Sequence, residues 1–121
     1  MNYNGGFPFG GAAKGLFRQK TVPVKSLPPN AWGLYEIHGN VFQWCNDRHG
    51  EYSGSAERDP TGPSSGSDRV YRGGRWSGIA RYCRSANRGW DTPDSRDSRL
   101  GFRIAAQATP ESGQVRSGKD F

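Results

Sequence analysis

The sequence has few apolar residues and no long hydrophobic run. Hydrophobic residues make up 32% of its 121 positions, and no stretch approaches the ~20 apolar residues of a membrane-spanning helix. Its 18 glycines and 8 prolines exclude a coiled coil or a helical bundle. No basic start followed by an apolar stretch opens the sequence, so it predicts no secretory leader. We therefore expect no membrane partner, and the cellular location stays unknown.

Metal-ligating residues are also scarce. His38 and His49 form no HxxxH or HExxH arrangement, which excludes a histidine-rich zinc or iron centre. Cys45 and Cys83 are too few for a disulfide-rich scaffold. A bond between them would stabilise the chain by up to ~4 kcal/mol. Free, buried thiols are the favoured alternative.

Aromatic residues are abundant, in contrast. Four Trp, five Tyr and six Phe exclude a solvated, disordered chain. With so few aliphatic residues, aromatic side chains must form the core, and we expect four of them there: Trp32, Tyr35, Trp44 and Phe102. Trp76 and Trp90 lie in polar, turn-rich segments, so we expect them to be exposed and available for binding.

The positive charge is concentrated in one stretch. The net charge is +6, and residues 68–103 carry nine Arg against four Asp, with no Lys. Because Arg is preferred where a planar fork must bind carboxylates or carbonyls, we favour structural arginines over a nucleic-acid surface. Arg84, Arg88 and Arg103 are expected to bind backbone carbonyls together with the carboxylates of Asp94 and Asp97.

Three regions follow from the patterning. Residues 1–28 read as an extended arm, residues 29–105 as the core, and residues 106–121 as a mobile tail.

Short strands are expected within these regions. Residues 21–24 could form an edge strand, since Pro23 removes a ladder donor. Residues 31–47 are strand-compatible around a tight turn or bulge at Gly39-Asn40. Residues 69–72 and 100–105 read as two further strands, and residues 48–68 as a polar loop.

Six segments follow one another along the chain: PNAWGLYE (29–36), HGNVFQWC (38–45), DPTGP (59–63), RVYRGG (69–74), CRSANR (83–88) and LGFR (100–103). Together they resemble the formylglycine-generating enzyme (sulfatase-modifying factor) family. The resemblance implies an α+β fold of short strands and irregular loops: a modified C-type-lectin-like fold. Family domains are about twice as long, so the chain corresponds to the C-terminal part of such a domain. Either the chain is a truncated, minimal version of the domain, or it associates with another chain that completes the fold.

The resemblance allows a test of catalysis. The family's enzyme uses two cysteines five residues apart, which bind copper(I) as thiolates and activate oxygen. Cys83 corresponds to the second cysteine, whereas Gly78 stands at the first. Because a tight linear copper(I) site needs two thiolates, the sequence argues against copper and against catalysis. Cys83 would be catalytic only if the chain were nevertheless an enzyme.

The resemblance also implies a calcium site near the Gly-Asn turn. The side chains of Glu36 and Gln43 and the carbonyls of Gly39 and Val41 would supply hard oxygen ligands. The family usually has Glu where this chain has Gln43, so one ligand charge is lost.

Two functions remain open. The first is a non-catalytic module that binds a protein or small ligand through loops at 75–82 and 89–99. Its candidate residues are Arg75, Trp76, Ser77, Ile79, Arg81, Tyr82, Trp90, Asp91, Asp94 and Arg99. Variable proteins of diversity-generating retroelements share this fold and vary in the same stretch. The alternative is an oxidoreductase, or a fragment of one, that acts on a peptide cysteine.

Self-association is the last expectation. If half of the domain is missing, apolar side chains should be left uncovered, namely Leu16, Phe17, Val22, Val24 and Leu34. A second copy could cover them, with exchange of the 1–28 arm, so a homodimer is predicted. In the alternative, the arm folds back onto its own core and the chain is a monomer.

Overall fold

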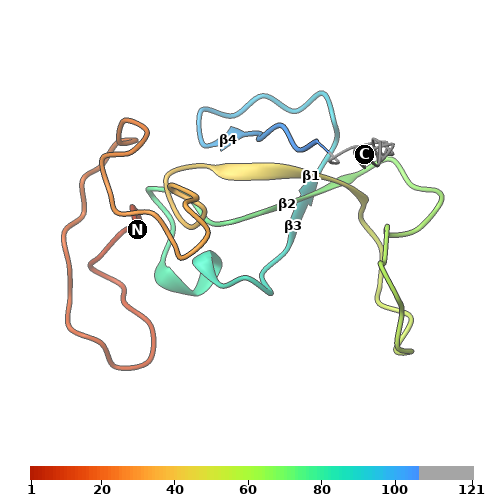
Figure 1. Cartoon of the computed structure of the whole chain (residues 1–121), viewed down its shortest axis with the longest axis horizontal. Coiled ribbons are helices and arrows are strands. Elements are labelled where there is room, and N and C mark those ends of the chain that lie inside the picture. The colour runs from red at the N-terminus through yellow and green to blue at the C-terminus, as the bar shows by residue number, and fades with distance from the viewer. Residues whose placement is uncertain (107–121) are drawn as a thin grey trace, which may run out of the picture.

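The computed structural model describes residues 1–106, and most of the tail predicted over 106–121 lies outside the described residues. Within the described range the chain forms four short strands and one 3-10 helix (Figure 1). The elements are β1 (Phe42–Arg48), β2 (Arg69–Arg72), η1 (Ala80–Cys83), β3 (Gly89–Asp91) and β4 (Leu100–Gly101). The expected α+β fold of short strands and irregular loops is confirmed.

The strands form one mixed sheet in the order β3-β2-β1-β4. β1 is antiparallel to β2, and Trp44 lies opposite Tyr71. β2 is antiparallel to β3, with Val70 opposite Trp90. β4 adds to the other side of β1 in parallel orientation. Segments far apart in the sequence therefore meet in the sheet.

A left-handed turn precedes β1, as the Gly-Asn pair predicts. Gly39 and Asn40 have φ values of 83° and 64°, a conformation that favours Gly and Asn. The amide of Gly39 donates to the carbonyl of Gly73 at 2.6 Å. The turn thus joins the entry into β1 to the end of β2.

The core is small and lies on the central strands. Val70 is 1% exposed and Phe42 is 9% exposed. The ring of Tyr71 packs against Phe42, with centroids 4.7 Å apart, and against Trp44 at 5.8 Å. An aromatic core is therefore present, but it is centred on β1 and β2.

Two of the four aromatic residues assigned to the core are exposed instead. Trp32 is 83% exposed and Phe102 is 74% exposed. Trp32 lies in a turn, where the side chain of Asn30 accepts hydrogen bonds from the amides of Trp32 and Leu34. Phe102 follows the end of β4, where strand pairing has stopped. Neither ring lies over the sheet, so the core assignment was wrong for both.

The strand predictions were correct for residues 69–72 and too long elsewhere. Residues 21–24 form no strand, because Val22 exchanges hydrogen bonds with the side chain of Asn40 rather than with another strand. Within 31–47 the strand begins only at Phe42, after the turn. The last strand is limited to Leu100–Gly101.

The N-terminal arm contacts the end of the sheet near η1 (red to orange in Figure 1). Asn2 forms an isolated parallel bridge with Gly39. The amide of Asn4 donates to the carbonyl of Gly78 at 2.9 Å, and the amide of Ala80 donates to the carbonyl of Phe7 at 3.2 Å. The first residues of the arm are therefore docked on the core of the same chain.

Among residues 1–106, no helix has the length and apolarity that crossing a membrane would require.

Candidate binding site

The segment 75–82 is held from both sides by backbone hydrogen bonds. Gly73 and Gly74, with φ values of 95° and 78°, turn the chain out of β2. The amide of Trp76 then donates to the carbonyl of Asn40 at 2.8 Å. Together with the bond from Asn4 to the carbonyl of Gly78, this places the segment between the turn before β1 and the arm.

The arm covers part of this segment. The ring of Phe17 stacks on Trp76, with centroids 6.3 Å apart, so Trp76 is half-buried rather than exposed. Arg75 is also half-buried, and its guanidinium carbon lies 5.6 Å from the centroid of the Phe42 ring. Both residues thus pack against the chain itself.

Other candidates of the segment remain accessible. Tyr82 is 44% exposed, Arg81 is exposed and Ile79 is half-buried. Arg75 Nε and Ser77 Oγ are buried and have no hydrogen-bond partner among the described residues. Two polar atoms of the segment are therefore left unsatisfied by residues 1–106.

The second predicted segment, 89–99, begins at the β3 edge of the sheet. Trp90 is 53% exposed, as expected, and its ring stacks on His49 with a centroid distance of 4.0 Å. The carboxylate of Asp91 accepts hydrogen bonds from the amide of Thr92 and the hydroxyl of Ser95, both at 2.8 Å. Asp94 is exposed.

Arg99 forms an ion pair with Asp97. Their closest side-chain atoms are 2.5 Å apart, and a second guanidinium nitrogen is 2.8 Å from the carboxylate. Hydrogen bonds from Arg99 lower the pKa of Asp97 to about 2, and the carboxylate raises the pKa of Arg99. The more distant charge of Arg75 also lowers the pKa of Asp97.

The arginines predicted to be structural bind carbonyls, but not the expected carboxylates. Arg84 donates to the carbonyl of Arg81 at 3.2 Å, and Arg88 donates to that of Gly50 at 3.0 Å. Arg103 donates to the carbonyl of Tyr35 at 2.5 Å. Among residues 1–106, the carboxylate of Asp97 is paired with Arg99 instead.

Both cysteines are free, so the disulfide alternative is wrong. Cys83 is 5% exposed and Cys45 is half-buried. Burial raises the pKa of each thiol, which favours the protonated form. A protonated Cys83 thiol with Gly78 at the other ligand position does not fit copper(I), which needs two thiolates. Residues 1–106 also contain no cluster of three His, Cys, Asp or Glu side chains that could hold a metal.

The donors expected for calcium are engaged within the chain. The Glu36 carboxylate is buried and accepts hydrogen bonds from the amides of Lys25 and Leu27. The amide oxygen of Gln43 accepts a 2.6 Å hydrogen bond from Arg103. A guanidinium at this oxygen repels a second cation, so the arrangement does not fit calcium. Calcium binding by this chain stays a prediction.

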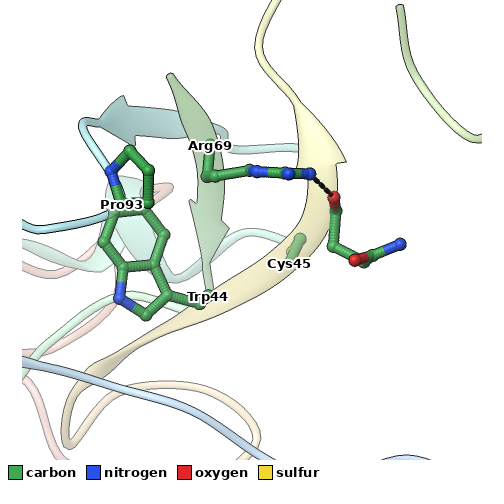
Figure 2. Close-up of a pocket in the computed structure, with 5 residues that line it drawn as sticks. Trp44, Cys45, Arg69 and Pro93 are labelled. Atoms are coloured by element: carbon green, nitrogen blue, oxygen red, sulfur yellow. Dashed lines mark hydrogen bonds between the residues drawn. The ribbon is translucent and has the colours of Figure 1, made fainter. Parts of the chain in front are cut away.

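Hollows also lie beside and outside the segments singled out from the sequence. One, of about 200 Å³, is lined by Met1, Leu27 and residues between 28 and 38. A smaller one, of about 140 Å³, is lined by Trp44, Cys45, Asn46, Arg69 and, from the segment 89–99, Pro93. Figure 2 shows Trp44 and Pro93 among the residues that line this hollow, and Arg69 donates a hydrogen bond to the carbonyl of Asn46.

A larger hollow is a groove of about 490 Å³ between the segment 47–63 and the side chains of Arg72 and Arg88. Sequence reasoning read residues 48–68 as a polar loop and missed this groove. The aromatic side chains of His49 and Tyr52 were the feature of this loop that could have indicated a groove. The residues that they contact, Trp90 and Arg88, lie far from them along the chain.

The fold and the loops define a class of protein. One small mixed sheet with irregular loops on a rigid core is a C-type-lectin-like domain of the formylglycine-generating enzyme type. Residues 3–108 match the family model described as the sulfatase-modifying factor enzyme 1-like domain. The chain belongs to this family.

Relatives and solved structures agree with this membership. The chain is 42% identical over 115 residues to a formylglycine-generating enzyme of Bos taurus, a match covering 92% of this chain and 30% of the relative. Among solved structures, Treponema denticola variable protein 1 is 46% identical, with a TM-score of 0.65, over 70% of this chain and 31% of that one. PvdO from Pseudomonas aeruginosa is 32% identical, with a TM-score of 0.61, over 79% and 36%. The chain therefore spans about a third of the proteins that it resembles.

Proposed function

We propose that this chain is a non-catalytic module that binds a protein or small ligand through the loops at 75–82 and 89–99. The observation that carries the proposal is Gly78, which stands where copper-dependent catalysis in the family requires a cysteine. The remaining thiol, Cys83, is buried and has a raised pKa. A single protonated thiol offers neither a metal site nor a nucleophile.

The same loops have the properties of a recognition surface. Tyr82 and Trp90 expose large aromatic rings. Tyr82 lies on the segment 75–82, which the arm and the turn before β1 hold, and Trp90 lies on strand β3 of the sheet. Rigid aromatic side chains supply contact area at a low entropic cost. The likeness to Treponema denticola variable protein 1 supports this proposal.

The test of the non-catalytic part is direct. The purified chain, loaded with copper(I) and supplied with oxygen, is incubated with a cysteine-containing sulfatase peptide, and the peptide mass is measured. The bovine formylglycine-generating enzyme is the positive control. We expect the peptide to remain unchanged, and formation of an aldehyde on it would overturn the proposal.

We further propose that the loops belong to a retroelement-diversified protein. The supporting observation is the likeness to the variable protein, at 46% identity. The test is to sequence the gene and its surroundings. A near-identical template repeat beside a reverse transcriptase gene would support the proposal, and its absence would leave an ordinary binding module.

The alternative function is a formylglycine-generating oxidoreductase, or a fragment of one, acting on a peptide cysteine. The identity to the bovine enzyme favours it. In that case Cys83 would be the catalytic residue, and the peptide assay above would yield the aldehyde.

We also propose a homodimer. Leu16, Val24 and Leu34 are 65%, 75% and 45% exposed, which leaves apolar surface for a second copy. Val22 and Phe17 are half-buried within the chain, in line with the alternative of a folded-back arm. Sedimentation at micromolar concentration distinguishes them: we expect twice the 13.3 kDa chain mass, and a stable 13.3 kDa species would refute the dimer.

A further inference from the structure

Three contacts hold one wall of the groove beside the segment 47–63. Arg88 donates a hydrogen bond to the carbonyl of Gly50 at 3.0 Å. Its guanidinium carbon also lies 3.9 Å from the centroid of the Tyr52 ring. The stack between His49 and Trp90, at 4.0 Å, joins the same two segments. Residues 49–52 are thus held against residues 88–90, so the groove of about 490 Å³ has a defined shape.

Six charged side chains line this groove, three of each sign: Arg48, Arg72, Arg88, Asp47, Glu51 and Glu57. Among residues 1–106, none of them forms an ion pair with another side chain. The three guanidinium groups are oriented instead by backbone carbonyls, as in the 2.9 Å bond from Arg72 to Ser85. Each guanidinium keeps further N–H donors, because it carries five.

Charges of both signs in one groove, none of them paired within residues 1–106, favour a ligand that carries both signs. A purely anionic ligand would be repelled by Asp47, Glu51 and Glu57, and a neutral one would desolvate these charges without compensation. The exposed ring of Tyr52, at 71%, offers an apolar surface beside them. Tyr, Trp and Arg are the residues enriched at the centres of protein recognition sites.

We infer that this groove binds an extended peptide segment that carries at least one basic and one acidic side chain. The inference rests on the proposed binding function, since Trp90 of the loop face stacks on His49, which stands between the groove-lining residues Arg48 and Gly50. It places the peptide along residues 47–63, outside the stretch 75–82. The acidic side chain of the peptide would meet Arg72 and Arg88, and the basic one Glu51 and Glu57.

The experiment is nuclear magnetic resonance of the isotope-labelled full chain. The probe is a synthetic mixture of blocked pentapeptides, each with one Lys or Arg and one Glu or Asp. Three further probes are an all-acidic mixture, an all-basic mixture and the neutral oligosaccharide cellohexaose. We expect the mixed-charge peptides to shift the amide signals of Gly50, Tyr52 and Gly62 at millimolar concentration.

Two variants assign these shifts to the groove. Glu57→Gln removes one charge, and its neutral amide can still accept the 2.6 Å hydrogen bond from Ser53, so the fold is preserved. We expect Glu57→Gln to weaken the binding of the mixed-charge peptides about fivefold, because the loss of one partly exposed ion pair has an effect of this size. Arg88→Gln should weaken this binding further. The control, Lys14→Gln, removes one positive charge from an exposed side chain of the arm and should leave the binding unchanged.

The other outcomes are also decisive. Shifts confined to residues 75–82 would overturn the groove and leave the proposed function standing, whereas no shift anywhere would count against both. Equal binding of the all-acidic or the all-basic mixture would refute the mixed-charge ligand. Shifts at Gly50 and Tyr52 produced by cellohexaose alone would replace the peptide with a carbohydrate.

Discussion

The Cys83 side chain occupies the space that a side chain at Gly74 would need. A Cβ atom at Gly74 would lie 3.0 Å from the Cα and 3.2 Å from the Cβ of Cys83, and closer still to the sulfur. The φ of Gly74 is also +78°, so any other residue there is strained. The Gly-Gly pair after β2 is therefore required by packing as well as by the turn.

Gly74→Ala should consequently be severely destabilising. We expect the free energy of unfolding to fall by about 3 kcal/mol or more, because backbone strain and overpacking add. Gly10→Ala is the matched control: its φ is +66°, and no atom lies within 4 Å of the added Cβ. Strain alone should cost it about 1 kcal/mol. Urea unfolding measures both, and equal losses would contradict the close contact.

Arg103→Ala should lower the melting temperature by about 4–8 °C, the shift produced by about 1 kcal/mol in a domain of this size. Arg103 joins distant segments, because it donates to Gln43 at 2.6 Å and to the carbonyl of Tyr35 at 2.5 Å. Arg58 and Arg103 are both exposed, but Arg58 forms no such bonds within residues 1–106, so Arg58→Ala should change little. Thermal unfolding followed by circular dichroism makes the comparison, and similar shifts would show that the Arg103 bonds contribute no stability.

The Asp97–Arg99 pair predicts a loss of stability in acid. Hydrogen bonds from Arg99 lower the pKa of Asp97 from 3.8 to about 2. Because the folded-state pKa is the lower one, the stabilisation is complete above pH 3.8 and is lost as the pH falls towards 2. Asp97→Asn should remove this part of the acid dependence, whereas Asp94→Asn, in the same loop, should retain it. Urea midpoints at pH 5, 4, 3 and 2 test this, and unchanged acid dependence in Asp97→Asn would refute it.

The two thiols should differ in reactivity. Cys83 is 5% exposed and Cys45 is half-buried, so iodoacetamide should label Cys45 first in the native chain. Burial raises the pKa of both thiols, and the thiolate is the reactive form. Labelling should therefore accelerate only at alkaline pH. Mass spectrometry counts the labels, and a mass gain of two hydrogens on reduction would reveal a disulfide instead.

Some features of the fold could be read directly from the sequence. The Gly39-Asn40 turn and the strand at residues 69–72 follow from signals that act over a few neighbouring residues. The composition, rich in Gly and Pro, excludes long helices in the same local way. The six ordered segments from residue 29 to residue 103 identify the family, because their spacing is carried by the chain itself.

Burial and side-chain partners were decided by the tertiary structure. Trp32 and Trp44 are equally apolar in the sequence, yet Trp32 is 83% exposed while Trp44 packs on Tyr71. Which ring is covered depends on whether a distant strand pairs beside it. Arg99 forms an ion pair with Asp97, two residues away, whereas Arg103 donates a hydrogen bond to the carbonyl of Tyr35, 68 residues away.

The groove shows the same division. Sequence alone determined that residues 48–68 form a polar, turn-rich loop and that Trp90 is exposed. Only the fold brought His49 against Trp90 and Tyr52 against Arg88. Local preferences act over a few residues along the chain, whereas a binding groove requires segments separated by nearly forty residues to meet. The sheet that brings them together exists only once the whole chain has folded.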